Sequence, residues 1–330
     1  VMGIATSIGL GIMQIGGGLN HLFDVPNNNF TKILITILMV AIFLGSSLTG
    51  LNHGVRWLSN LNILLGAILL IFILIFGDLK FILESYTLAI SDYLQHFIEY
   101  SLRVNPYSGD DSWIQQWTVF YWAWVISWSP FIGGFVARVS RGRTIREFVV
   151  GVLIIPPLIS FTWIAGFGGT AIKLALNHND KLVHIVDKDY TVALFELLSH
   201  FPLSEVTSSL AIVLIFIFIV TSADSTTHIV AGMATGGSIN PTLKHKVLWG
   251  LLIGAISVAM TIAGGLKSLQ TASVITGLPF SIILLLMIFS LMRALKREPI
   301  HHFKMTSIDD EKDYSISLEE REKQDEQENQ

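Results

Sequence analysis

The sequence predicts an all-α integral membrane protein. Hydrophobic residues make up 52% of the 330 residues, charged residues only 14%, and the mean hydropathy is +0.60. Apolar stretches of about 20 residues, long enough to cross a hydrocarbon layer of about 30 Å, recur along the chain. These stretches are apolar nearly all round, whereas the helices of a soluble protein carry a polar face at a 3.6-residue period.

Eight of these stretches are expected to be transmembrane helices. They lie near residues 1–23, 31–51, 56–77, 114–137, 147–168, 207–232, 247–265 and 273–294. The first stretch opens at Val1 inside a Gly-rich apolar helix, with no signal-peptide pattern before it. We therefore expect an N-terminally truncated chain, in which residues 1–295 form an incomplete transmembrane domain.

The distribution of Lys and Arg indicates the orientation in the membrane. Residues 138–146 carry four arginines and form the most basic loop, and basic loops face the cytoplasm. Threading outward from this loop places the C-terminus in the cytoplasm and segments 24–30, 78–112, 169–205 and 266–272 outside. Because the basic loop joins two spans, its expected partners are anionic membrane lipids and the carboxylates of the C-terminal tail, and not nucleic acid. The expected location is the cell membrane.

Two segments do not resemble spans. Residues 80–103 alternate apolar and polar positions at helical spacing, which predicts an amphipathic helix on the outer membrane surface. Residues 296–330 are polar and, after Asp309, mostly acidic, which predicts a solvated and disordered cytoplasmic tail. A regulatory or partner-binding role for this tail remains an alternative.

The span at 114–137 carries an unusual number of aromatic residues. Trp117, Trp122, Trp124 and Trp128 run from its start toward mid-membrane, whereas aromatic residues normally collect at the membrane–water interfaces. Aromatic faces attract cations, and quaternary ammonium ligands commonly use this attraction. The span therefore indicates a binding site for a methylated ammonium compound. An aromatic packing face with an ordinary proline kink is the alternative.

A break in the same span supports the binding hypothesis. Pro130 removes a backbone donor, and Gly133 and Gly134 loosen the helix further. In transporters, broken helices near the midplane direct free backbone groups at substrate and ions. Positions 117, 120, 121, 124 and 128 share a broad helical face, and Trp122 lies off it. The candidate substrate-binding residues are Phe120, Tyr121, Trp122, Trp124, Val125, Trp128, Ser129, Pro130 and Phe131, with Ser129, Pro130 and Phe131 forming the break.

The span at 207–232 contains a candidate cation site. The hydroxyls of Thr221 and Ser222, with the Phe218 carbonyl one turn earlier, are hard oxygen ligands of the kind that sodium prefers. The alternative is that these hydroxyls bond back to carbonyls of the preceding turn, which is common in membrane helices.

Several stretches closely resemble the betaine–choline–carnitine transporter family. The resemblance covers nearly the whole chain up to the tail. It rests on Trp117–Trp124, Ile126–Phe131 and Ala137–Phe148, with further likeness at Gly3–Gly11, Arg56–Asn62, Phe161–Gly169 and Thr221–Ser225.

This resemblance implies a twelve-helix protein with a leucine-transporter-like inverted-repeat core, of which this chain supplies the fifth to twelfth helices. It also implies a secondary active transporter of glycine betaine, choline or carnitine. A sodium ion would bind at Phe218, Thr221 and Ser222, completed by a third helix outside this chain. Relatives often form homotrimers, so a homotrimer is the assembly that the resemblance implies.

One residue departs from the family pattern. Family members commonly carry Trp at the position of Val125, and the loss of one cation–π partner costs roughly 0.5–2 kcal/mol. The substrate is therefore expected to sit differently or to differ from glycine betaine. The first Lys or Arg of the chain is Lys32, so the helix at 1–23 carries no Lys or Arg of the kind that, in sodium-independent relatives, replaces the sodium ion. This favours sodium symport over proton coupling or exchange.

The remaining function classes are less well supported. A channel or a sensor built on the same scaffold is an alternative to a carrier. The sequence contains neither cysteine nor a recognisable nucleophile, zinc or nucleotide-binding motif. It therefore predicts that the protein is not an enzyme and uses no cofactor beyond the coupling sodium ion.

Overall fold

The computed structural model describes residues 1–49, 52–103, 112–140, 142–177, 180–238 and 240–297. Within these ranges the chain is helical and contains no strand, which confirms the predicted all-α class. The chain divides into two units, Val1–Ile282 and Ile283–Gln330, and the description below concerns the first unless stated. The acidic tail predicted at 296–330 lies almost wholly outside the described residues.

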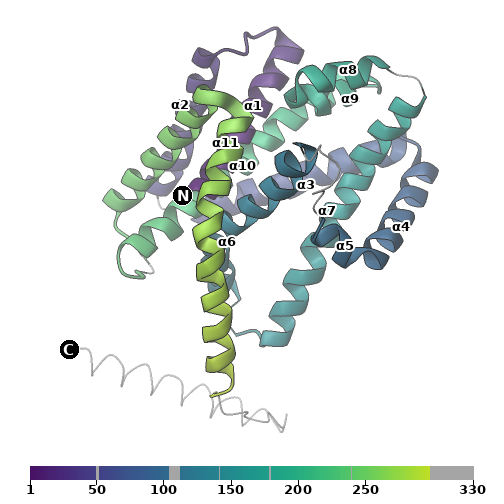
Figure 1. The fold of residues 1–330 in the computed structure, drawn as a ribbon. Coiled ribbons are helices and arrows are strands. Elements are labelled where there is room, and N and C mark those ends of the chain that lie inside the picture. Colours follow the sequence, from purple (N-terminus) through teal and green to yellow (C-terminus); the bar gives the residue numbers. More distant parts are fainter. Residues whose placement is uncertain (50–51, 104–111, 141, 178–179, 239, 298–330) are drawn as a thin grey trace, which may run out of the picture. The chain divides into compact units, whose positions relative to one another are not determined.

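Seven helices in the described ranges are long and apolar enough to cross a membrane. They are α1 (Met2–Phe23), α2 (Asn29–Thr49), α3 (Asn52–Phe76), α6 (Phe120–Val139), α7 (Ile145–Leu176), α10 (Ser204–Ala234) and α11 (Leu243–Leu295) (Figure 1). These helices confirm the multi-pass membrane class.

Helix α11 explains why seven helices correspond to eight predicted spans. Gly264 and Gly265 have non-helical backbone angles and divide α11 into two arms. Gly265 has φ 55°, a left-handed conformation that only glycine adopts without strain. The two arms match the spans predicted near 247–265 and 273–294. Residues 266–272, which the sequence placed outside the membrane between these two spans, are helical and form the first turns of the second arm.

The segment predicted as an amphipathic helix is helical in the structure. It forms α4 (Leu79–Gln95) and α5 (Phe97–Ser101), and α4 packs beside α7. Asp78 caps α4 by accepting a hydrogen bond from the Phe81 N–H at 3.0 Å, and its carboxylate lies 3.5 Å from the Lys173 ammonium of α7. The location of α4 at a membrane surface stays a prediction.

Three short elements follow α7. They are α8 (Asp180–Lys188), the single 3-10 turn η2 (Tyr190–Val192) and α9 (Ala193–Ser199). Phe195 and Leu198 of α9 are fully buried and pack with Ile73 of α3 and Phe167 of α7 in one of two apolar clusters. This cluster anchors the short elements beside the long helices.

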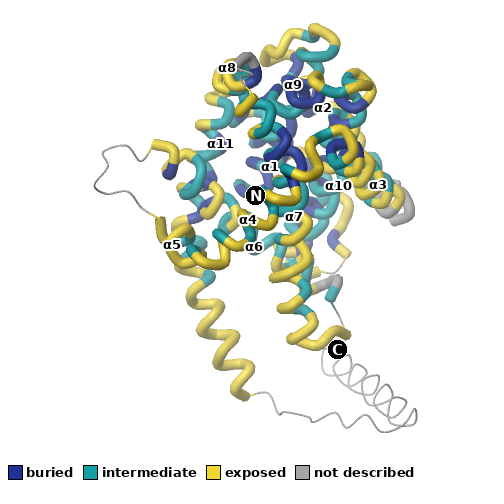
Figure 2. Tube along the Cα trace, turned by 90° about the vertical axis from the view of Figure 1, so that its right-hand side faces the viewer, coloured by how far each residue is buried: buried dark blue, intermediate teal, exposed yellow. Residues whose placement is uncertain are grey.

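Helix α1 is the most buried of the long helices (Figure 2). Its Ile4, Ile8 and Ile12 form the second apolar cluster together with side chains from α2, α10 and the first arm of α11. The Gly-rich sequence of α1 makes this packing close. A Cβ at Gly3 would lie only 2.7 Å from the backbone nitrogen of Trp128 in α6.

Helix α7 has the opposite character. Leu153, Ile155 and Ile159 are among its many exposed apolar side chains, and its most apolar window has no buried residue. A stripe of this size would be unfavourable in water but suits contact with lipid. Helix α7 therefore has the length and the apolar surface of a membrane span, as its sequence predicted near residues 147–168.

Candidate functional site

The aromatic residues of α6 divide between two faces. Phe120 is buried, and Trp124 and Trp128 are half-buried against the rest of the unit. Tyr121, Trp122 and Val125 are exposed to 50%, 42% and 55%. The candidate substrate-binding residues of α6 therefore lie on two faces of the helix, one packed against the rest of the unit and one open. The open face can contact a ligand directly, whereas a residue of the packed face can do so only through a polar group that has no partner within the protein.

Helix α1 holds the packed face in place. The Trp124 ring stacks on Phe120 with ring centres 5.6 Å apart and planes 5° from parallel. The Trp124 Nε1–H donates to the Gly3 carbonyl at 2.9 Å and to Ser7 Oγ at 3.2 Å. A buried indole needs a partner for its N–H, and the backbone of α1 provides it. These contacts give Trp124 the packing role that the sequence left open as an alternative.

Trp128 differs from Trp124 in its hydrogen bonding. Its ring packs on the apolar cluster around α1 and lies 6.2 Å from the ring of Phe131. Its Nε1–H is buried and has no hydrogen-bond partner within the described part of the chain. An unsatisfied buried donor costs about 1–3 kcal/mol. Trp128 therefore carries a donor that an acceptor on a ligand would satisfy.

The predicted break at Ser129, Pro130 and Phe131 was wrong. Helix α6 continues through Pro130 to Val139. Proline cannot donate to the carbonyl four residues earlier, which belongs to Ile126. The Ser129 hydroxyl donates to this carbonyl at 2.7 Å, so the turn stays satisfied and helical. The irregular turn instead precedes α6, where Ile114–Val119 form the π-helical element η1.

The candidate sodium ligands lie on α10. The Thr221 hydroxyl donates to the carbonyls of Ile217 at 2.9 Å and Phe218 at 3.1 Å. This is the back-bonded arrangement considered as the alternative. It also brings two of the three predicted ligand oxygens together. Ser222 is half-buried one residue further, and the Phe218 side chain is 58% exposed. Sodium binding at these oxygens stays a prediction.

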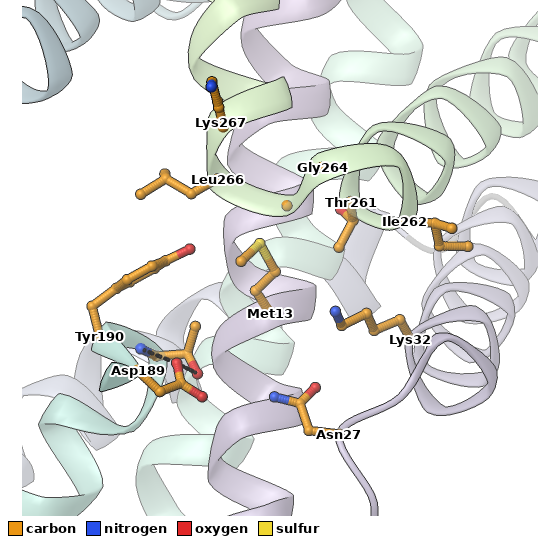
Figure 3. Close-up of a pocket in the computed structure, with 12 residues that line it drawn as sticks. Met13, Asn27, Lys32, Asp189, Tyr190, Thr261, Ile262, Gly264, Leu266 and Lys267 are labelled. Atoms are coloured by element: carbon orange, nitrogen blue, oxygen red, sulfur yellow. Dashed lines mark hydrogen bonds between the residues drawn. The ribbon is translucent and has the colours of Figure 1, made fainter. Parts of the chain in front are cut away.

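A separate cavity of about 480 Å³ lies at the bend of α11 (Figure 3). We call it the kink cavity. Its lining comes from α1, the segment after it, the start of α2, η2 and the two arms of α11. The lining residues are Met13, Asn27, Lys32, Asp189, Tyr190, Thr191, Thr261, Ile262, Gly264, Gly265, Leu266 and Lys267. Segments 24–30, 169–205 and 266–272 were all expected on the outer side of the membrane, and the cavity brings residues from each of them together.

Tyr190 is a half-buried titratable residue of this cavity. Burial of its hydroxyl, with the nearby charge of Asp189, raises the pKa of Tyr190 to about 12. Asp189 caps η2, because its Oδ1 accepts from the Thr191 N–H at 2.9 Å and from the Thr191 hydroxyl at 2.6 Å. Tyr190 is therefore a hydrogen-bond donor throughout the physiological pH range.

Sequence reasoning missed the contributions of α1 and of the kink cavity. Gly3 and Ser7 orient Trp124, and the spacing of glycines along residues 1–23 was the available signal. Lys32 entered the sequence argument only as the first Lys or Arg of the chain. Its position beside a bend more than 200 residues later depends on tertiary contacts that local patterns do not contain.

The long apolar helices and the aromatic face of α6 define a multi-pass membrane protein with a candidate solute site. Residues 1–300 match the family described as BCCT, the betaine/carnitine/choline family transporters. The chain belongs to this family.

Similar proteins have names that agree with this assignment. The chain is 50% identical over 297 residues to the ectoine/hydroxyectoine transporter of Virgibacillus pantothenticus, covering 90% of this chain and 59% of the relative. It is 42% identical over 299 residues to the glycine betaine transporter OpuD of Bacillus subtilis, covering 90% and 58%. It is 36% identical over 304 residues to the osmo-independent choline transporter BetT1 of Acinetobacter baylyi, also covering 90% and 58%.

Two statements follow from these comparisons. The chain spans about three fifths of the length of the curated relatives it matches. These relatives are named as transporters, which confirms the prediction that the protein is not an enzyme.

Proposed function

We propose that the full-length protein is a secondary active transporter that takes up a cationic or zwitterionic compatible solute across the cell membrane. The observation that carries this proposal is the aromatic face of α6 in a chain of this family. Tyr121 and Trp122 are exposed there, and aromatic faces attract quaternary ammonium groups. Glycine betaine, choline and carnitine are the solutes that the sequence favours.

The proposed mechanism is alternating access coupled to sodium. The inward sodium gradient would drive uptake, with the ion at the Thr221 hydroxyl and the Phe218 carbonyl, whose oxygens lie 3.1 Å apart. Ser222 would add a third oxygen. Rocking of one helix bundle against another would then expose the solute to each side in turn. We also propose that the protein assembles as a homotrimer, as the family resemblance implies. Its C-terminus would lie in the cytoplasm, as the basic loop at 138–146 indicates.

Ectoine is a second candidate substrate. Val125 is 55% exposed on the open face of α6, at the position where the family resemblance implies a tryptophan ring. The planar amidinium group of ectoine can stack on a single aromatic ring, whereas a trimethylammonium group is bound by several ring faces that surround it. The relative with 50% identity is named as an ectoine/hydroxyectoine transporter. Both observations favour a substrate other than glycine betaine.

An uptake assay tests these proposals. The full-length protein would be expressed in a cell that lacks its own solute carriers, with radiolabelled glycine betaine, choline, carnitine or ectoine supplied in sodium or potassium medium. Saturable uptake that collapses in potassium medium would support a sodium symporter and identify its substrate. Persistent uptake in potassium would contradict the sodium site and indicate proton coupling or exchange. Non-saturable flux would indicate a channel, and absence of uptake would favour a sensor.

Replacement of Trp128 tests the assignment of the substrate site. We expect Trp128→Ala to raise the half-saturation concentration at least about tenfold, because the ring and its free N–H are lost together. Trp57→Ala is the matched control, since Trp57 is 64% exposed on α3 and lies outside the proposed site. Normal uptake affinity in the Trp128 variant would exclude this residue from the site.

A further inference from the structure

The kink cavity contains an unpaired positive charge. Lys32 is half-buried at the start of α2, and its ammonium group points toward the middle of the cavity, near Met13 (Figure 3). The ion pairs found in the described part of the chain involve Lys80, Lys173 and His96, and none involves Lys32. A partly buried ammonium group that lacks a counter-charge is unfavourable. It therefore favours capture of an anion from solution.

The other charged residues of the lining define the charge of this anion. Lys267 lies on the second arm of α11, is exposed, and its ammonium group points away from the middle of the cavity in Figure 3. Asp189 is the single carboxylate of the lining, and its Oδ1 is occupied by Thr191. Lys32 therefore contributes the one positive charge that faces the middle of the cavity. This charge matches a monovalent anion, whereas a divalent anion would be repelled more strongly by Asp189.

Neutral donors complete the lining. The Tyr190 hydroxyl also points toward the middle of the cavity in Figure 3. The Asn27 amide lies on the side of Lys32 and can donate through its nitrogen. The cavity volume of about 480 Å³ exceeds that of a halide ion, and one liquid water occupies about 30 Å³. An anion of a few heavy atoms would therefore bind with several waters.

We propose that the kink cavity binds a monovalent anion, either chloride or the carboxylate group of a small molecule, beside the Lys32 ammonium group. The anion would join the start of α2 to the bend of α11 and to η2, three segments far apart in the sequence. Its binding would stabilise the bend at Gly264 and Gly265. This site is separate from the aromatic face of α6 and does not depend on which solute is transported.

Thermal unfolding of the full-length protein in detergent tests this proposal. Tryptophan fluorescence would report the unfolding midpoint in sodium sulfate, sodium chloride or sodium acetate at constant ionic strength. Because sulfate stabilises folded proteins in general, stabilisation by each anion is measured as the gain of the wild type over Lys32→Gln, and we expect a saturable gain with the monovalent anions. Stabilisation by chloride alone would identify an inorganic anion, and equal or stronger stabilisation by acetate would identify a carboxylate. Stronger stabilisation by sulfate would overturn the proposal.

Three variants separate this site from general salt effects. Lys32→Gln should weaken the apparent affinity for the anion about tenfold or more, because it removes the nearest charge. Lys80→Gln is the matched control, since Lys80 is exposed and paired with Glu84, and it should respond as the wild type does. Asp189→Asn keeps an acceptor for Thr191 but removes the negative charge, so it should strengthen binding several-fold.

The two cavity variants also provide independent outcomes. An unchanged response in Lys32→Gln would refute the site. If Lys32→Gln does not fold, Asp189→Asn still decides the question, because weaker or unchanged binding in that variant would contradict the charge argument.

Discussion

Replacement of Gly3 by alanine tests the closest contact between α1 and α6. A Cβ at this position would lie 2.7 Å from the Trp128 nitrogen, 2.8 Å from the Ser127 carbonyl carbon and 2.9 Å from the Trp128 Cα. All three are backbone atoms, so no side chain can rotate away. Ordinary contact begins near 3.4 Å, so the shortest distance must increase by 3.4 − 2.7, or about 0.7 Å.

Three contributions determine how Gly3→Ala changes the free energy of unfolding. Inserting a methyl group into a tight contact costs roughly 1–3 kcal/mol. Separation of the helices would also lengthen the Trp124 Nε1–H bond to the Gly3 carbonyl, which is 2.9 Å in the wild type and contributes about 1 kcal/mol. Alanine favours a helix over glycine by about 1 kcal/mol, which offsets part of this loss. The expected net effect is a destabilisation of about 1–3 kcal/mol.

The assay compares Gly3→Ala with a control in another helix. Gly151 lies inside α7, and a Cβ there would meet no atom within 4 Å. Gly151→Ala should therefore be neutral or stabilising by up to about 1 kcal/mol. Unfolding midpoints of the full-length protein, followed by tryptophan fluorescence, would be compared. If Gly3→Ala unfolds at or above the midpoint of Gly151→Ala, the close approach of α1 and α6 is refuted.

Two further predictions concern hydrogen bonds and ion pairs. Thr6→Val should destabilise the protein by about 1–3 kcal/mol, because it leaves the Ser273 hydroxyl, 2.9 Å from Thr6 Oγ1 and fully buried, without this partner. In denaturation measurements, Thr6→Val combined with Ser273→Ala should cost less than the sum of the single changes, and strict additivity would contradict the pairing. The Phe81 N–H bond, aided by Lys173, lowers the pKa of Asp78 below 3.8, so its stabilisation is present above that pH and is lost as pH falls through the lowered pKa. The difference in unfolding midpoint between wild type and Asp78→Ala should therefore shrink in acid, and a constant difference from pH 7 to 2 would exclude this role.

The composition of the chain was sufficient to predict its class and most of its helices. Apolar stretches of about 20 residues are required by the thickness of the bilayer, so hydropathy alone located the seven long helices. The same local patterns identified the helix at 79–95. The local patterns did not reveal that residues 266–272 are helical, because the bend at Gly264 and Gly265 joins the two arms of α11 without a loop. The positive φ of Gly265 allows the second arm to begin immediately.

The arrangement of α6 shows a limit of helical periodicity. Spacing placed positions 120, 121 and 124 on one broad face, but the structure buries Phe120 and exposes half of Tyr121. The boundary between a packed face and an open face depends on where a neighbouring helix lies. Pro130 shows that a proline does not always break a helix. The Ser129 hydroxyl donates to the Ile126 carbonyl, which proline leaves without its backbone donor, and α6 continues.

The sequence by itself determined that the chain is a helical membrane protein with an aromatic span, and its motifs determined the family resemblance. These properties are local, since they depend on residue types within one helix length. Tertiary structure alone decided that α1 is the central helix, that Trp124 is held by the Gly3 carbonyl, and that Lys32 faces the bend of α11. The physical reason is that packing and burial join residues that are distant in sequence, and no local pattern encodes which helices will be neighbours.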